Sequence, residues 1–233
     1  MKKTEEEILR TVRSVLGSNW DRRDGVVVPS PEDVALDNAA VQMEGAVLYA
    51  DLAGSSKLTQ EYKDYFVAEI YKSFLNAATD VIRNNDGEIT AFDGDRVMAV
   101  FIGGSKCTNA AKASLQINAV VRKVNELIAE RYPSTKYRID YAVGVDVSKL
   151  FVVRTGIRGF NDLAWIGDAS NVAAKLSNVR DFDGKSFITK RLFDRMADSS
   201  KFSDTTKKTC MWNLISKQIL GHDIYQSTWW WNL

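Results

Sequence analysis

The chain contains little cysteine and little proline. Its 233 residues include 2 cysteines and 3 prolines. Two cysteines, Cys107 and Cys210, are too few for the disulfide framework of a small secreted domain and are consistent with a reducing compartment. We interpret each of them as a small buried hydrophobe rather than a reactive thiol.

An excess of charge of one sign is also absent. Lysine and arginine total 31 and aspartate and glutamate total 30, so no basic excess indicates nucleic acid or an anionic membrane as a partner. No stretch approaches the roughly 18 uninterrupted apolar residues of a membrane-spanning helix. The N-terminal segment carries acidic residues and lacks the long apolar run of a signal peptide. We therefore expect a cytoplasmic protein that contacts neither nucleic acid nor membrane.

Composition and turn residues divide the chain into an extension and one large domain. Hydrophobic residues make up 45% of the chain and charged residues 26%, which is typical of a globular protein with a sizeable core. Thr4 precedes a short amphipathic pattern that ends near Gly17. The stretch 18–44 contains two of the three prolines and predicts an irregular linker. We therefore assign 1–44 to an N-terminal helix and linker, and 45–233 to a compact domain with an aromatic C-terminal tail.

The compact domain alternates between strand and helix patterns. A buried strand at 45–52 is followed by one long helical pattern that reaches Ile82. The sequence EITAFDGDRVMAVFIGG predicts a hairpin with a tight turn at DGD. Four further elements follow: a helix at about 106–131, a strand at 136–148, another strand at 150–156 and a third helix from about Gly167. This order predicts a ferredoxin-like α+β fold, in which helices cover one face of an antiparallel-rich sheet.

Two aspartates lie where strands of this sheet end. Asp51 closes the first strand and Asp95 lies at the tip of the hairpin expected beside it. Because neighbouring strands are about 5 Å apart, both carboxylates can share a pair of hard cations such as Mg²⁺. The small residues Gly54, Ser55 and Ser56 come just before a helix and leave backbone N–H groups free for a phosphate. The pattern predicts a site for metal ions and a phosphorylated ligand.

Three motifs together resemble one enzyme family. YADLAGSSKLT, FDGDRVMAVF and WIGDASNVAAKL are similar, in this order and over about 45–180, to the motifs of class III adenylyl and guanylyl cyclases. The last region and the aromatic end most resemble the short pyrimidine cyclases of bacterial antiphage signalling (Pycsar). The resemblance implies a lyase that closes a nucleoside triphosphate into a 3′,5′-cyclic monophosphate and releases pyrophosphate.

The resemblance also implies the roles of particular residues. Asp51 and Asp95 would bridge two divalent cations, Mg²⁺ or Mn²⁺, with the backbone carbonyl of Leu52 as a further ligand. Asn171 would position the ribose, and Lys175 would stabilise charge on the α-phosphate. Most relatives carry arginine where this chain has Lys175, so the planar fork of an arginine is replaced by a point charge. The single histidine, His222, lies outside every motif, and we interpret it as structural.

The base-reading positions depart from those of the purine cyclases. By resemblance, the residues that would read adenine are Ala91 and Ala164, and alanine supplies neither donor nor acceptor to a purine edge. An alignment shift of two positions would replace Ala164 by Asp162. Three residues are candidates for contacts with a smaller base: Tyr49 and Phe92, which would narrow the pocket, and Arg96, which would donate to a pyrimidine carbonyl. We therefore favour UTP as substrate, with CTP or a purine triphosphate as alternatives.

The same resemblance implies partners. Class III cyclases form head-to-tail pairs in which the two metal-binding acids and the Asn and basic residues of one site come from different subunits, so a homodimer with shared active sites is expected. The product is expected to act on a separate effector protein, in antiphage defence. Two other functions stay open: a cyclase-like nucleotide-binding module without turnover, and a polymerase-like or diguanylate-forming relative. The intact acids count against the first, and the absence of a GGDEF-like turn counts against the second.

Overall fold

The computed structural model describes residues 2–204 and 208–233, which form two compact units. One unit comprises the chain up to Met43 together with Lys149–Gly167, and the other comprises Glu44–Ser148 and Asp168–Leu233. Two long strands, β2 (Ala39–Leu52) and β5 (Tyr141–Ile157), run from one unit into the other. Each unit therefore holds part of the same two strands.

The unit that contains the N-terminus is built around the beginning of β2, up to Met43, and the end of β5, from Lys149. Its helix α1 (Glu5–Gly17) begins with a capping box, in which Thr4 and Glu7 satisfy each other's backbone N–H groups. The stretch predicted as an irregular linker contains β1 (Asp21–Asp24), which pairs with the start of β2, and the short helix η1 (Pro31–Asp33). A strand that the sequence did not predict, β6 (Phe160–Ile166), forms a hairpin with β5.

The other unit contains the main part of the sheet. Its strand order is β3-β4-β2-β5-β7-β9-β8, with β5 and β7 parallel and the pairs β2–β4, β3–β4, β7–β9 and β8–β9 antiparallel. The bounds of its remaining strands are β3 (Glu88–Asp93), β4 (Arg96–Phe101), β7 (Ser186–Thr189), β8 (Asn213–Ile219) and β9 (His222–Ser227). The expected hairpin at DGD is present as β3 and β4.

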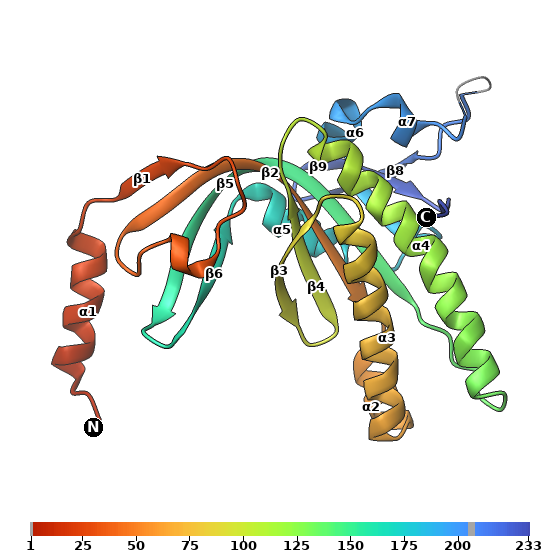
Figure 1. Ribbon diagram of the computed structural model, residues 1–233, viewed down its shortest axis with the longest axis horizontal. Helices are drawn as coiled ribbons and strands as arrows, with labels where there is room; N and C mark the ends of the chain where they lie inside the picture. Colours follow the sequence, from red (N-terminus) through yellow and green to blue (C-terminus); the bar gives the residue numbers. More distant parts are fainter. Residues whose placement is uncertain (1, 205–207) are drawn as a thin grey trace. The chain divides into compact units, whose positions relative to one another are not determined.

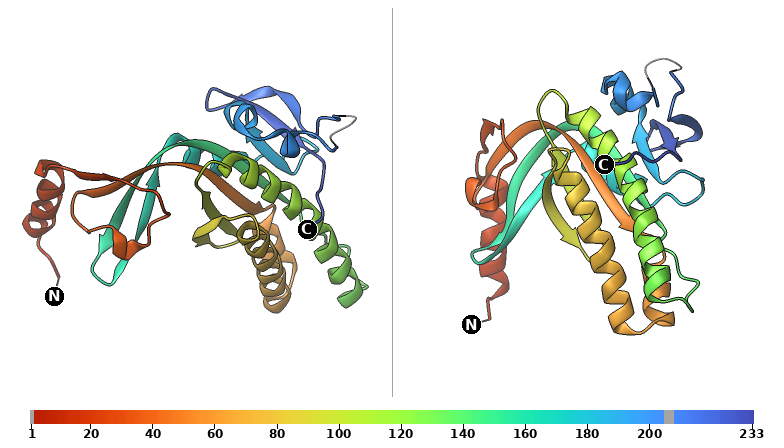
Figure 2. Two further views of the ribbon diagram at one scale, coloured as in Figure 1. Left: turned by 45° about the horizontal axis from the view of Figure 1, so that its top comes forward. Right: turned by 45° about the vertical axis from the view of Figure 1, so that its right-hand side comes forward.

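Two long helices, α3 (Asp64–Arg83) and α4 (Lys106–Arg131), lie side by side over one face of this sheet (Figures 1 and 2). Alternate residues of the strands point toward these helices, because successive side chains of a strand lie on opposite faces. The core beneath the helices includes Leu48 and Ala50 of β2, Val97 and Ala99 of β4, Phe74 of α3 and Leu115 of α4. Burial of this apolar surface, at about 25 cal/mol per Å², is the main force that holds the layers together.

A shorter helix, α5 (Asp168–Leu176), packs on the opposite face of the sheet. Its residues Val172 and Leu176 join a separate apolar cluster with Ala142 of β5 and Phe187 of β7. Gly144 of β5 permits this close approach, since a Cβ there would lie 2.2 Å from the carbonyl oxygen of Ala173. Three short helices complete this unit: α2 (Ser55–Glu61), α6 (Lys190–Arg195) and α7 (Asp198–Lys201).

Three predicted boundaries differ from the structure. The strand predicted to begin at residue 45 begins at Ala39, as β2. The helical pattern after Gly54 is divided into α2 and α3, because Lys63 is extended and the Tyr62 ring stacks on Phe66 with centroids 4.8 Å apart. The two strands predicted at 136–148 and 150–156 form the single strand β5, whose first part pairs with β7 and whose second part pairs with β6. None of the helices that the structure describes is long and apolar enough to span a membrane.

The aromatic tail lies along α4. The Asn118 side chain donates to the carbonyl of Trp229 at 2.8 Å, and the N–H of Trp231 donates to the carbonyl of Leu115 at 3.0 Å. The guanidinium of Arg122 lies 4.0 Å from the ring centroid of Trp230. The tail is therefore held to α4 by backbone and side-chain contacts.

Candidate active site

The register of the sheet brings Asp51 and Asp95 together. Asp51 of β2 pairs directly with Arg96 of β4, and Asp95 immediately precedes Arg96 in the two-residue turn of the hairpin. Gly94, with φ of +61°, allows that turn to be this tight. Because paired residues of neighbouring strands are about 5 Å apart, the two carboxylates share one corner of the sheet.

At this corner the partly buried carboxylate of Asp51 lies close to a second carboxylate, that of Asp95. Burial, and after it the nearby negative charge of Asp95, raise the pKa of Asp51 to about 6 against the opposing effect of Arg180 and Arg96. Oδ2 of Asp95 is buried and has no hydrogen-bond partner among the residues that the structure describes. A buried carboxylate oxygen without a partner is costly, so this pair of acids suits a bound cation.

A cation at this corner would need ligands beyond the two acids. Within residues 2–204 and 208–233, no three or more His, Cys, Asp and Glu side chains gather as a metal site. Mg²⁺ is commonly held by one or two carboxylates with water and substrate phosphates completing its shell. Asp51, Asp95 and the carbonyl of Leu52, the last residue of β2, fit such a partial set.

The small residues after Asp51 lie at the start of a helix. Gly54 has φ of +70° and is the N-cap of α2, and Ser55 and Ser56 are its first two residues. First-turn N–H groups of a helix have no partner within the helix. The predicted phosphate-facing residues therefore follow directly on the strand that carries Asp51.

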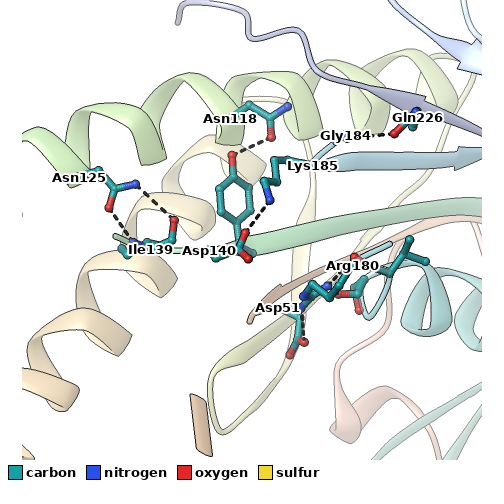
Figure 3. Close-up of polar contacts among 12 residues, drawn as sticks. Asp51, Asn118, Asn125, Ile139, Asp140, Arg180, Gly184, Lys185 and Gln226 are labelled. Carbon is teal, nitrogen blue, oxygen red and sulfur yellow. Dashed lines mark hydrogen bonds and ion pairs between the residues drawn. The ribbon is translucent and has the colours of Figure 1, made fainter. Parts of the chain in front are cut away.

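An arginine that the sequence did not single out contacts this corner. Nη2 of Arg180, in the loop after α5, lies 3.3 Å from Oδ2 of Asp51 (Figure 3). The Arg180 side chain is 29% exposed and the Asp51 side chain 14%, so the pair lies at an accessible edge. No motif signals this contact, because the loop after α5 approaches β2 only in the folded chain.

Tyr49, Ala91 and Arg96 lie on the same face of the sheet as Asp51. Tyr49 and Ala91 both pair with Met98, and the Tyr49 hydroxyl contacts the Met98 sulfur at 3.0 Å. The Arg96 guanidinium lies 5.2 Å from the centroid of the Tyr49 ring and is bound to Asp93 at 2.7 Å. An apolar surface and a positive charge therefore stand beside the acid pair.

The remaining predicted base contacts are Phe92 and Ala164. Phe92 pairs with Val97, whose side chain belongs to the core beneath α3 and α4, so Phe92 projects from the other face and is 57% exposed. The alternation of side chains in β3 separates it from Tyr49. Ala164 lies in the other compact unit, where it pairs with Val153 in the β5–β6 hairpin.

Asn171 and Lys175 project from one exposed side of α5, as their spacing of four residues predicts. Neither forms an ion pair or hydrogen bond with Asp51 or Asp95 in the part of the chain that the structure describes.

The start of α5 is anchored through Asp168. Its carboxylate binds Arg191 at 2.7 Å and His222 at 2.9 Å. Arg191 also holds the fully buried Asp146. His222 therefore belongs to a network that positions α5.

Similarity to known proteins covers nearly the whole chain. A uridylate cyclase of Burkholderia cepacia is 41% identical over 232 residues, which is 98% of both chains. A uridylate cyclase of Xanthomonas perforans is 38% identical over 234 residues, again 98% of both. The chain belongs to the uridylate cyclase family. No family model matches it.

The fold of this uridylate cyclase family member agrees with that assignment. The structure of a bacterial light-regulated adenylyl cyclase superposes with a TM-score of 0.68 at 20% identity, covering 80% of this chain and 91% of the other. The predicted fold class and the resemblance to pyrimidine cyclases are therefore confirmed.

Proposed function

We propose that the chain converts UTP into 3′,5′-cyclic UMP and pyrophosphate. The support is the convergence of Asp51 and Asp95 beside Arg96 and Tyr49, in a chain similar over nearly its full length to uridylate cyclases. Asp51, Asp95 and the Leu52 carbonyl would hold two divalent cations, Mg²⁺ or Mn²⁺. When bound, these cations lower the pKa of the ribose 3′-hydroxyl and neutralise the triphosphate.

The remaining residues act on the substrate. Amides at Gly54, Ser55 and Ser56 face the phosphates, Asn171 orients the ribose and Lys175 stabilises charge on the α-phosphate. Holding the 3′-oxygen in line with the α-phosphorus turns the reaction into an oriented intramolecular attack. Negative charge that develops on the α-phosphate during this attack is stabilised by fixed positive groups more effectively than by water.

Arg96 supplies the preference for uracil in this proposal. Uracil presents carbonyl acceptors, whereas cytosine presents an amino donor at position 4, and arginine has only donors. The side chain of Ala91, two positions from Asp93 in β3, adds no polar group that could read a purine edge. The ring of Tyr49 fills space on the same face.

A product analysis tests this directly. Purified protein is incubated with Mn²⁺ or Mg²⁺ and an equimolar mixture of the four nucleoside triphosphates, and cyclic products are identified by mass spectrometry. Cyclic UMP is expected as the main product, and the Asp95→Asn variant is expected to make none. Cyclic AMP as the main product would contradict the proposal, and binding of UTP without any product would favour a non-catalytic module.

The proposal includes a homodimer with shared sites. Asn171 and Lys175 of one subunit would serve the Asp51 and Asp95 of the other across a two-fold axis. Asp51→Ala and Lys175→Ala proteins, each inactive alone, should regain activity when mixed, up to about a quarter of the wild-type value for random exchange. Normal subunit exchange without any regain would contradict shared sites.

We place this reaction in the cytoplasm, where its triphosphate substrate is made, and both cysteines of the described chain are free. The product would act on a separate effector during antiphage defence. Cells that carry the protein with its effector should resist phage, and the Asp51→Ala variant should abolish both that resistance and the rise in cyclic UMP.

A further inference from the structure

Arg180 is held in place by neutral groups. Its Nη1 donates to the carbonyl oxygens of Ser177 at 2.7 Å and Val179 at 2.9 Å, while Nη2 extends to Asp51 (Figure 3). The two carbonyls fix the plane of the guanidinium without cancelling its charge. The side chain therefore presents a preoriented positive fork at the edge of the acid pair.

Asp51 is the single acid that pairs with Arg180 among the described residues. The contact at 3.3 Å is longer than the 2.7–2.9 Å typical of a charge-assisted hydrogen bond. If Asp51 held the cations of the proposed reaction, Arg180 would still be bound to the two carbonyls and would lack an acidic partner. The groups that arrive next to it with negative charge are the phosphates of the substrate.

We propose that Arg180 is a substrate-binding residue that contacts the triphosphate, from the same subunit as Asp51. This inference rests on the proposed cyclase function and extends it. In this assignment Arg180 supplies the planar donor fork that Lys175 lacks.

Nucleotide binding tests the contact apart from turnover. Calorimetry with Mg²⁺ compares UMP with α,β-methylene-UTP, in which the bond to the leaving pyrophosphate is replaced by an unreactive P–CH₂ bond. In Arg180→Gln the affinity for the triphosphate analogue is expected to fall about tenfold or more, and the affinity for UMP to change less than about twofold. Arg180→Lys should give an intermediate loss. Arg83→Gln, at an exposed position at the end of α3, is the matched control.

Three outcomes would overturn the inference. Unchanged affinity of Arg180→Gln for the analogue would make Arg180 a counter-ion that only balances Asp51 before the cations bind. An equal loss of affinity for UMP and for the analogue would mean that Arg180 acts by keeping Asp51 and Asp95 in position. A parallel loss of Mn²⁺ binding, measured by electron paramagnetic resonance, would mean the same. Thermal unfolding of Arg180→Lys and Arg180→Gln shows whether either variant is misfolded.

Subunit mixing tests the same-subunit assignment. A mixture of Arg180→Gln and Asp51→Ala should have the same activity per Arg180→Gln chain as Arg180→Gln alone. The reason is that no mixed dimer then contains a site in which both Asp51 and Arg180 are intact. Regained activity in this mixture would place Arg180 opposite the acids and refute the assignment. Failure of the proposed function appears differently, as wild-type protein that makes no cyclic nucleotide, while the binding comparison still reports on Arg180.

Discussion

Replacing Asp51 by asparagine should stabilise the metal-free protein while abolishing activity. The carboxylate is partly buried beside Asp95, and its folded pKa of about 6 lies above the ordinary value of 3.8. The folded chain therefore holds this proton more tightly than the unfolded chain does. Stability conferred by the protonated form is present below pH 3.8 and is lost as the pH rises from about 4 to 6.

The size of the effect follows from the same two values. Each pH unit between 3.8 and about 6 corresponds to about 1.4 kcal/mol, which gives an upper bound of about 3 kcal/mol at pH 7 and above. The neutral amide of the Asp51→Asn variant removes the charge at every pH. Loss of the Arg180 contact offsets part of the gain, so an increase in unfolding free energy of about 1–3 kcal/mol is expected.

Thermal unfolding in EDTA measures this difference. At pH 8 the melting temperature of Asp51→Asn should exceed that of the wild type by about 5 °C, since 1 kcal/mol shifts Tm by about 2–4 °C in a chain of this size. At pH 4 the two proteins should differ little. Millimolar Mn²⁺ should raise Tm of the wild type and leave the variant unchanged. Asp183→Asn, at an exposed position in the loop before β7, is the control.

A metal-free Asp51→Asn protein that is less stable than the wild type at pH 8 would refute the reasoning. That result would mean that the Arg180 contact stabilises the ionised Asp51 by more than burial and the charge of Asp95 destabilise it. Asp51 would then be a structural ion-pair residue, and cation binding would not explain its position in the sheet.

Three further predictions concern α5 and its surroundings. Gly144→Ala should reduce activity at least about tenfold and lower Tm, because its Cβ would meet the carbonyl of Ala173 at 2.2 Å and displace the helix, and both values can be measured on the purified variant. His222→Gln should keep the hydrogen bond to Asp168 and change kcat less than about twofold, so a large loss of kcat at normal Tm would make His222 catalytic. Lys175→Arg should retain activity that Lys175→Ala loses, measured as initial rates of product formation.

The repeating patterns of the sequence predicted most of the fold. The helix at 106–131 and the hairpin around Gly94 agree with the structure because each depends on local signals: apolar spacing in the helix and a glycine with positive φ in the turn. The division at Lys63 and the continuity of β5 were missed. Both depend on tertiary partners, namely the ring of Phe66 and the successive pairing with β7 and β6.

The sequence predicted the positions of some residues at the candidate site and not of others. The pairing of Asp51 with the hairpin follows from strand adjacency, and the common face of Tyr49 and Arg96 follows from alternation along neighbouring strands. Phe92 was grouped with Tyr49 because they lie near the motifs in sequence, yet the alternation places it on the other face. No sequence motif pointed to Arg180, because this arginine reaches Asp51 only when the loop after α5 is folded.

The apolar core determines which way the acidic corner faces. Leu48, Ala50 and Leu52 alternate with Tyr49 and Asp51 along β2, and all three apolar side chains are buried beneath the helices. A slip of one residue would turn Asp51 into that core and expose the leucines, which no local gain could offset. The burial of Leu48 and Leu52 therefore also keeps Asp51 and Tyr49 on the open face of the sheet. Core substitutions that loosen the register of β2 against β4 should consequently impair metal binding before they unfold the protein.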